Sequence, residues 1–235
     1  MNSRNVKRLL YFNTISFLIF GLFFIFFPVI DIFFSNLFFI DNVFISEKYI
    51  FIKKLRIFLK DLMVVIPIVA LCYLVLNYLN EKHEIKTKIR KLRIKIVCLG
   101  LIIGPVFGSG IIANFVFKEN WGRARPVHIE EFGGDKIFTP AFLKTDQCKR
   151  NCSWISGETS AAFSFLTGVL ILKNRIYLLI NLLIGVLVFF CRVSMGGHFM
   201  SDNIFAIIFM IYLAIFYRYL ALYFIKKRKK WSTKS

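Results

Sequence analysis

The residues with the clearest potential for chemistry are a histidine and several cations beside the ends of apolar segments. Asp202 follows His198 by four residues. If both lie in the first turn of a helix, this spacing places them on one face. The carboxylate can then hold one imidazole nitrogen and leave the other as a nucleophile. Arg192 lies six residues before the histidine, at the end of another apolar run.

Three further cations, Lys118, Arg123 and Arg125, follow an apolar run within eight residues. Arginine forks match phosphate oxygens bidentately, whereas lysine acts as a point charge. The alternative for Arg123 alone is an interfacial side chain that extends to lipid headgroups. As a group, these residues predict a site for a phosphorylated headgroup at a membrane surface.

Ser156, Gly157 and Glu158 precede a further apolar run. A small hydroxyl and a glycine at a helix start allow backbone N–H groups to approach an anion. The same residues would also serve as an ordinary helix cap. They therefore support a phosphate site only in combination with the cations.

The composition is typical of an all-α integral membrane protein. The chain is 57% hydrophobic with 29 Phe and a mean hydropathy of +0.66, and several apolar runs reach the ~18 residues that can cross a bilayer. The net charge of +19 could suggest a nucleic-acid partner. Lysine and arginine lie between the apolar runs, however, so membrane topology explains the charge and no nucleic-acid partner is expected.

We predict one membrane domain over residues 1–235 with six transmembrane helices. A basic start makes the first segment resemble a signal peptide, but no small-x-small cleavage site follows, so we expect a retained span. The fourth span is short and polar at its start. The predicted spans are about 8–30, 62–79, 96–117, 159–172, 176–195 and 203–225.

The distribution of lysine and arginine predicts the orientation. They concentrate in the N-terminus, the loop after the second span, the turn after the fourth and the C-terminal tail. Short basic loops stay in the cytoplasm, so both termini are expected there. The opposite face would hold the loop at about 118–158. It would also hold segment 31–61, where mixed apolar and basic residues predict an interfacial amphipathic helix.

Two of the five cysteines, Cys148 and Cys152, lie in the predicted outward loop. An oxidising compartment would allow them to pair, provided that a turn brings their Cα atoms to ~5.5 Å. A disulfide and two free thiols are both compatible with the sequence. Cys72, Cys98 and Cys191 lie within or at the ends of spans, where we expect packing roles. No metal-ligand pattern is present, so neither a metal nor a cofactor is expected.

Together the motifs resemble the type 2 phosphatidic acid phosphatase (PAP2) superfamily, whose pattern is K-x6-R-P, then P-S-G-H, then S-R-x5-H-x3-D. The matching residues are Lys118 to Arg125-Pro126, Ser156-Gly157, and Arg192 to His198 to Asp202. The resemblance covers roughly residues 95–220 and implies a PAP2-type helical bundle. It also implies that Lys118, Arg125 and Arg192 bind phosphate, that His198 is phosphorylated, and that Asp202 orients it.

Two positions depart from this pattern. Cys191 stands where the third motif usually has serine, and Glu158 stands where the second motif usually has the histidine that protonates the leaving group. Glu158 is then the candidate general acid. It can act so only if a buried or apolar setting raises its pKa, and nearby cations would oppose that.

The outward loop is similar to that of bacterial lipid A phosphatases, particularly the 4′-phosphatase group, in which an acidic residue can also replace the second-motif histidine. The matching stretches are Gly122–Pro126, Phe132–Lys136, Phe138–Pro140, Asn151–Ser153 and Ser156–Glu158. This resemblance implies lipid A as the substrate, an inner-membrane location and a periplasmic active site.

The sequence thus predicts a metal-independent lipid phosphatase that acts through a phosphohistidine. Undecaprenyl diphosphate, phosphatidylglycerol phosphate and phosphatidate remain alternative substrates. An alternative of another class is a non-catalytic phospholipid-binding membrane protein. A transporter would need ionisable groups near the membrane midplane, and the apolar runs contain few.

Overall fold

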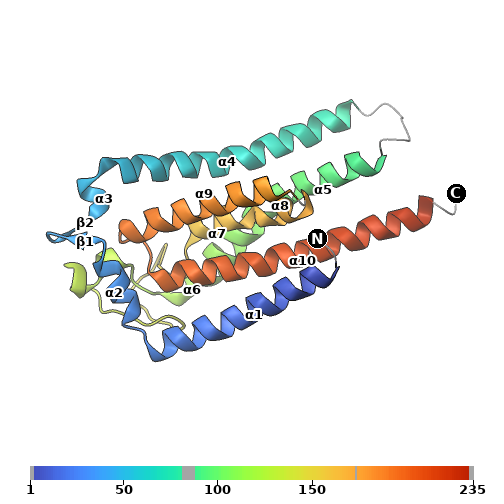
Figure 1. Cartoon of the computed structure of the whole chain (residues 1–235). Coiled ribbons are helices and arrows are strands. Elements are labelled where there is room, and N and C mark those ends of the chain that lie inside the picture. The colour runs from blue at the N-terminus through green and yellow to red at the C-terminus, as the bar shows by residue number, and fades with distance from the viewer. Residues whose placement is uncertain (1–2, 81–87, 173, 233–235) are drawn as a thin grey trace.

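The computed structural model describes residues 3–80, 88–172 and 174–232, which form a bundle of helices with a loop-rich cap at one end (Figure 1). The long helices run roughly along one direction, and the short elements gather at the cap. The longer helices are α1 (Ser3–Phe26), α4 (Ile50–Leu79), α5 (Lys88–Pro105), α9 (Arg175–Ser194) and α10 (Met200–Ser232).

Five segments of the described residues are long and apolar enough to cross a membrane. They agree with five of the predicted spans to within several residues, with two exceptions. The second span begins at Ile50, earlier than predicted, and the third ends at His128, later than predicted. Gly157–Leu172, which contains the fourth predicted span, is an apolar helical segment too short to be counted with them. The five segments are Asn5–Phe26, Ile50–Leu79, Leu92–His128, Arg175–Ser194 and Met200–Ile225.

The two short helices of this segment, α7 (Gly157–Ser164) and α8 (Leu166–Leu172), lie at the centre of the bundle. They pack against α5, α9 and α10, and most of their residues are buried. Small residues permit this close packing, as is common between membrane helices. A Cβ atom at Gly104 of α5 would lie 2.4 Å from the carbonyl oxygen of Ser164.

The wide helix η2 (Val106–Lys118) carries the chain from α5 to the cap. It is a π-helix that begins directly after Pro105, whose nitrogen cannot donate the next helical hydrogen bond. Such helices are rare and often occur at functional sites. Here the helix ends at Lys118, so it sets the position of that side chain.

Segment 31–61 differs from the prediction of a separate interfacial helix. It contains α2 (Ile30–Asn36), a two-stranded antiparallel hairpin of β1 (Phe39–Ile40) and β2 (Val43–Phe44), and α3 (Ile45–Lys48). Residues 50–61 then belong to α4. The amphipathic pattern of 50–61 therefore reflects the extension of a spanning helix over the cap, with one face turned towards the protein.

The loop between η2 and α7 contains α6 (Glu119–Trp121) and the 3-10 turns η3 (Pro126–His128) and η4 (Glu130–Phe132). Cys148 and Cys152 form a disulfide in this loop, with Cα atoms 5.6 Å apart. The structure thus contains the pairing that the sequence left open.

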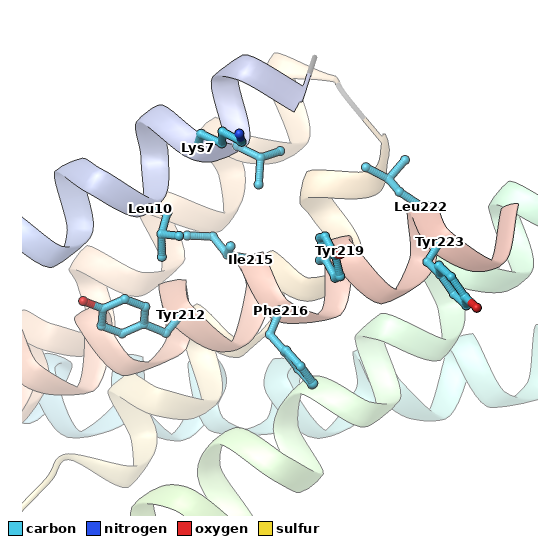
Figure 2. Close-up of a pocket in the computed structure, with 9 residues that line it drawn as sticks. Lys7, Leu10, Tyr212, Ile215, Phe216, Tyr219, Leu222 and Tyr223 are labelled. Atoms are coloured by element: carbon cyan, nitrogen blue, oxygen red, sulfur yellow. The ribbon is translucent and has the colours of Figure 1, made fainter. Parts of the chain in front are cut away.

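At the other end of the bundle, α1 diverges from α10 and leaves an apolar pocket lined by residues such as Leu10, Ile215 and Tyr219 (Figure 2). Lys7 and Tyr223 lie at its margin. Nearer the cap the two helices are joined, because Asn13 Nδ2 donates to the Ile208 carbonyl at 3.1 Å. None of the residues with candidate chemistry lines this pocket.

The arrangement predicts how engineered cysteines will react. A cysteine at position 135 should react with a membrane-impermeant thiol reagent added to spheroplasts, whereas one at position 88 should react only after permeabilisation, because short basic segments stay in the cytoplasm. The labelling is measured by gel shift after replacement of the three free cysteines. The opposite pattern would place the cap in the cytoplasm.

Candidate active site

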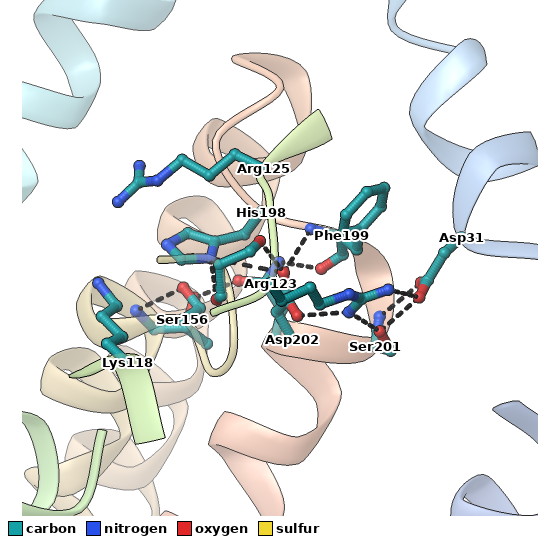
Figure 3. Close-up of polar contacts among 12 residues, drawn as sticks. Asp31, Lys118, Arg123, Arg125, Ser156, His198, Phe199, Ser201 and Asp202 are labelled. Carbon is teal, nitrogen blue, oxygen red and sulfur yellow. Dashed lines mark hydrogen bonds and ion pairs between the residues drawn. The ribbon is translucent and has the colours of Figure 1, made fainter. Parts of the chain in front are cut away.

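The three motifs meet at the cap end of the bundle (Figure 3). The first comes from the end of η2 and the loop after it, the second from the start of α7, and the third from the end of α9 and the start of α10. The side chains of Lys118, Arg125 and His198 lie on the same side of the cluster. Residues more than eighty positions apart in the sequence therefore share one site.

His198 is almost fully buried, with 1% of its surface exposed. Its Nδ1 lies 2.8 Å from the Ser153 carbonyl oxygen and 3.6 Å from Asp202 Oδ2. Because a carbonyl oxygen only accepts, Nδ1 carries the proton and Nε2 keeps its lone pair. The Ser153 carbonyl is thus the nearest acceptor of the Nδ1 proton, and the Asp202 carboxylate, which the sequence predicted in this position, lies slightly farther from the same nitrogen.

The environment keeps the imidazole neutral. Burial lowers the pKa of His198 well below 6.5, and the charges of Arg192, Lys118 and Arg125 lower it further. The interaction of the imidazole with the Asp202 side chain raises the pKa of His198 but does not overcome this shift. A neutral imidazole is the form that can attack phosphorus.

Asp202 is held by donors from three directions. Its carboxylate accepts hydrogen bonds from the Phe199 backbone N–H at 2.8 Å, from Ser153 Oγ at 2.5 Å and from an Arg123 guanidinium nitrogen at 2.6 Å. The first of these is a capping interaction at the start of α10. The Asp202 carbonyl also accepts from the Ser156 N–H at 3.1 Å, which ties the third motif to the second.

Arg123 has a different role from the predicted contact with phosphate. Its side chain is completely buried, and its terminal nitrogens donate to Asp202 and to Asp31 Oδ2 at 2.8 Å. Its Nε donates to the Thr139 carbonyl at 2.8 Å, and the guanidinium lies 4.2 Å from the centre of the Phe199 ring. All faces of the guanidinium are occupied by protein, so Arg123 holds the site together and does not face a substrate.

The other cations remain directed at the site. Lys118 Nζ donates to Asn151 Oδ1 at 3.2 Å, and the Arg125 guanidinium donates twice to the Asn151 carbonyl, at 3.0 and 2.7 Å. Asn151 lies between Cys148 and Cys152, so the disulfide constrains the turn that holds both cations.

Arg192 is 4% exposed, and its Nε is buried without a hydrogen-bond partner among the described residues. Its backbone carbonyl accepts from the N–H groups of Gly197 and His198, at 3.0 and 3.2 Å. A Cβ atom at Gly197 would lie 2.4 Å from the Arg192 guanidinium, so the glycine allows the guanidinium to take this position. A buried donor without a partner is costly unless a ligand satisfies it, which fits an anion site.

Ser156 and Gly157 shape the start of α7. The Ser156 hydroxyl caps the helix and is completely buried against Thr159. A Cβ atom at Gly157 would lie 3.0 Å from Lys118 Nζ. The glycine therefore allows the lysine to approach the helix start, whereas the serine orders the helix.

Glu158 does not have the raised pKa that a general acid needs at neutral pH. Arg56 of α4 donates to both of its carboxylate oxygens, and Arg192 lies 3.6 Å from it. Burial alone would raise the pKa of Glu158, but these guanidinium groups outweigh burial and leave the pKa below its usual value. The sequence analysis required a raised pKa for Glu158 to act as a general acid, and the pKa of Glu158 is lowered instead.

A pocket of about 400 Å³ opens beside Lys118 and Glu158, between α4, η2 and α7. Ser109, Asn114 and Lys60 contribute polar atoms, and Met63 and Val64 contribute apolar surface. Such a lining suits a molecule with both polar and apolar parts.

Several site residues were missed by the sequence analysis. Asp31 and Arg56 belong to no recognised motif. Asn151 and Ser153 lie in a stretch that resembles lipid A phosphatases, but no role was predicted for them, and backbone carbonyls have no sequence signal. Arg56 could have been suspected because a cation on the predicted outer face opposes the usual charge bias.

Comparison with known proteins gives a consistent set of relatives. Residues 94–226 match the model of the PAP2 superfamily. A lipid A 4'-phosphatase of Francisella tularensis subsp. novicida is 33% identical over 208 residues, which cover 86% of this chain and 90% of that protein. A lipid A 4'-phosphatase of Rhizobium leguminosarum is 33% identical over 192 residues, covering 75% and 80%. No solved structure shows significant similarity.

The burial of Arg123 predicts a large effect on stability. Arg123→Met leaves Asp31 and Asp202 buried without their cation, and breaking a buried ion pair costs about 3–5 kcal/mol. Thermal unfolding in detergent should show a strongly lowered melting temperature. Arg125→Met, which removes the same charge from a half-buried position, should lower the melting temperature much less. Equal effects of the two substitutions would contradict the structural role of Arg123.

Proposed function

Because the chain belongs to the PAP2 superfamily, we propose that it removes the 4′-phosphate of lipid A at the periplasmic face of the inner membrane. The family supports a lipid phosphatase that hydrolyses phosphoric monoesters. The names of two relatives, each matched over more than three quarters of its length, support lipid A as the substrate. The observation that carries the proposal is the buried His198, with Lys118 and Arg125 on the same side of the cluster (Figure 3) and with Arg192 bound to its backbone N–H.

In the first step, His198 Nε2 attacks the phosphorus in line with the leaving oxygen. Lys118, Arg125 and Arg192 hold the other three phosphate oxygens, where negative charge lies in the transition state. The phosphorus–oxygen bond to the lipid breaks, and the leaving oxygen takes up a proton from solvent water. The products are a phosphohistidine and a lipid hydroxyl.

In the second step, water attacks the phosphohistidine, releases phosphate and regenerates the neutral imidazole. The Ser153 carbonyl keeps the Nδ1 proton in place throughout, so the same tautomer is restored. Three fixed cations supply the charge stabilisation that a divalent metal supplies in other phosphatases. The proposal therefore includes no metal.

The position of the site fits a lipid headgroup. The site lies at the cap end of the bundle, and the spanning helices extend away from it (Figure 1). The basic N-terminal and C-terminal segments belong to the opposite end, which supports a cytoplasmic location for them and a periplasmic cap. The mixed lining of the pocket beside Lys118 supports a substrate that is partly apolar.

Mass spectrometry of lipids from cells tests the substrate. Cells that express the wild-type chain should contain lipid A lacking the 4′-phosphate, and cells that express His198→Gln should retain it, because a covalent route has no substitute nucleophile. Equal membrane levels of the two proteins serve as the control. Unchanged lipid A together with altered undecaprenyl diphosphate, phosphatidylglycerol phosphate or phosphatidate would contradict lipid A and identify another lipid.

The lowered pKa of His198 predicts a pH dependence. The neutral imidazole is the reactive form, so kcat should fall only when the pH drops through the pKa of His198, which burial places well below 6.5. The kcat for p-nitrophenyl phosphate, measured at saturating substrate across the acid range, should therefore stay constant down to pH 6.5. A loss of kcat centred at or above pH 6.5 would contradict a buried neutral nucleophile.

A further inference from the structure

We propose that Arg56 is a positioning residue of the active site, which holds Glu158 as an ionised counterion so that Glu158 can in turn orient Arg192 towards the phosphate. Arg56 lies in α4, outside residues 94–226 that match the family. The inference rests on the phosphatase part of the proposed function and is independent of which lipid is the substrate.

The contact between Arg56 and Glu158 is a two-pronged ion pair. Arg56 Nε lies 3.2 and 3.0 Å from the two carboxylate oxygens, and a terminal nitrogen lies 2.5 Å from Oε1. Fork-shaped pairs of this kind fix both direction and distance. The side chains are 32% and 22% exposed, so solvent screens the pair only in part.

Glu158 connects this pair to the phosphate site. Its Oε1, which accepts from Arg56, also lies 3.6 Å from a terminal nitrogen of Arg192. The Arg192 guanidinium is confined by Gly197, and its Nε has no partner among the described residues. Glu158 thus holds one edge of Arg192 and leaves Nε for an incoming anion.

The charges around the site explain why such a counterion is needed. Lys118, Arg125 and Arg192 repel one another when no phosphate is bound, and Asp202 is already paired with Arg123. A carboxylate beside Arg192 lowers this repulsion, and Arg56 keeps that carboxylate ionised and in place. The pKa of Glu158 is lowered accordingly, although burial alone would raise it.

This arrangement gives Glu158 a role other than proton donation. Protonation would remove the negative charge that attracts two guanidinium groups, so the ionised form is the one that the structure stabilises. Loss of Glu158 should then impair binding of the phosphate group itself, whatever leaving group is attached to it. Loss of Arg56 should have the same consequence.

The test combines the single variants Arg56→Gln and Glu158→Gln with the double variant. Each single variant should lower kcat/KM about 10- to 100-fold, as is typical when a residue that orients a ligand-binding side chain is removed. The losses should be similar for a lipid phosphate and for p-nitrophenyl phosphate, whose leaving group needs little protonation. The double variant should lose no more than the worse single variant, because both residues act through Arg192.

Lys54→Gln is the matched control. It removes one positive charge from the same helix at an exposed position, and it should leave kcat/KM unchanged. Arg56→Lys keeps the charge but loses the fork, so it should recover only part of the rate. The double glutamine variant removes both charges of the Arg56–Glu158 pair together, so neither of these two residues is left as an unpaired charge.

A binding measurement separates this inference from the proposed function. Inorganic phosphate should stabilise the wild-type protein and Lys54→Gln against thermal unfolding in detergent, and about tenfold more phosphate should be required for Arg56→Gln. This readout needs no turnover. Additive losses in the double variant, unchanged phosphate binding in Arg56→Gln, or a loss in Glu158→Gln confined to the lipid substrate would each overturn the positioning role.

Discussion

The buried contact of Arg123 with Asp202 and Asp31 is the interaction on which the geometry of the site depends. All three side chains are withdrawn from solvent, and a buried charge without a partner is strongly unfavourable. The loop after η2, the start of α10 and the short helix α2 must therefore come together. Once they do, Asp202 binds the Ser153 hydroxyl, and the Ser153 carbonyl reaches His198, the proposed nucleophile. The orientation of the histidine is thus a consequence of an ion-pair network that does not face the substrate.

A second constraint is the assembly of like charges in a mostly apolar protein. Lys118 and Arg125 are held by one residue, Asn151, whose turn is closed by the disulfide, and Arg192 is held by the backbone at Gly197 and by Glu158. These supports fix the cations before the phosphate arrives, so little reorganisation is required during the reaction. The fixed positive charges also lower the pKa of His198, so the groups proposed to bind the phosphate help to keep the proposed nucleophile neutral.

The helices that carry these groups follow closely from local sequence. Hydrophobic length located five spanning segments, because apolar composition is a property of each segment on its own. Segment 31–61 was less predictable: its mixed residues suggested an interfacial helix, whereas residues 50–61 extend α4 over the cap and residues 30–48 form small elements beneath it. Amphipathicity alone does not say whether the polar face meets lipid headgroups or the protein.

The sequence by itself determined the type of fold and the reaction class, and it predicted most side chains of the proposed site, because the spacing of Lys118, Arg125, Arg192, His198 and Asp202 is a linear pattern. Only the tertiary structure decided their individual roles. It turned Arg123 from a candidate phosphate ligand into a buried partner of Asp31, ninety-two positions away, and it placed Arg56 on Glu158 across one hundred and two positions. It also showed that a backbone carbonyl, that of Ser153, accepts the Nδ1 proton and so fixes the tautomer of His198. The physical reason is that a pKa, an ion pair or a hydrogen bond depends on which groups, distant in the sequence, lie within a few ångströms of one another. The periodicity of a segment describes only that segment and does not predict such contacts.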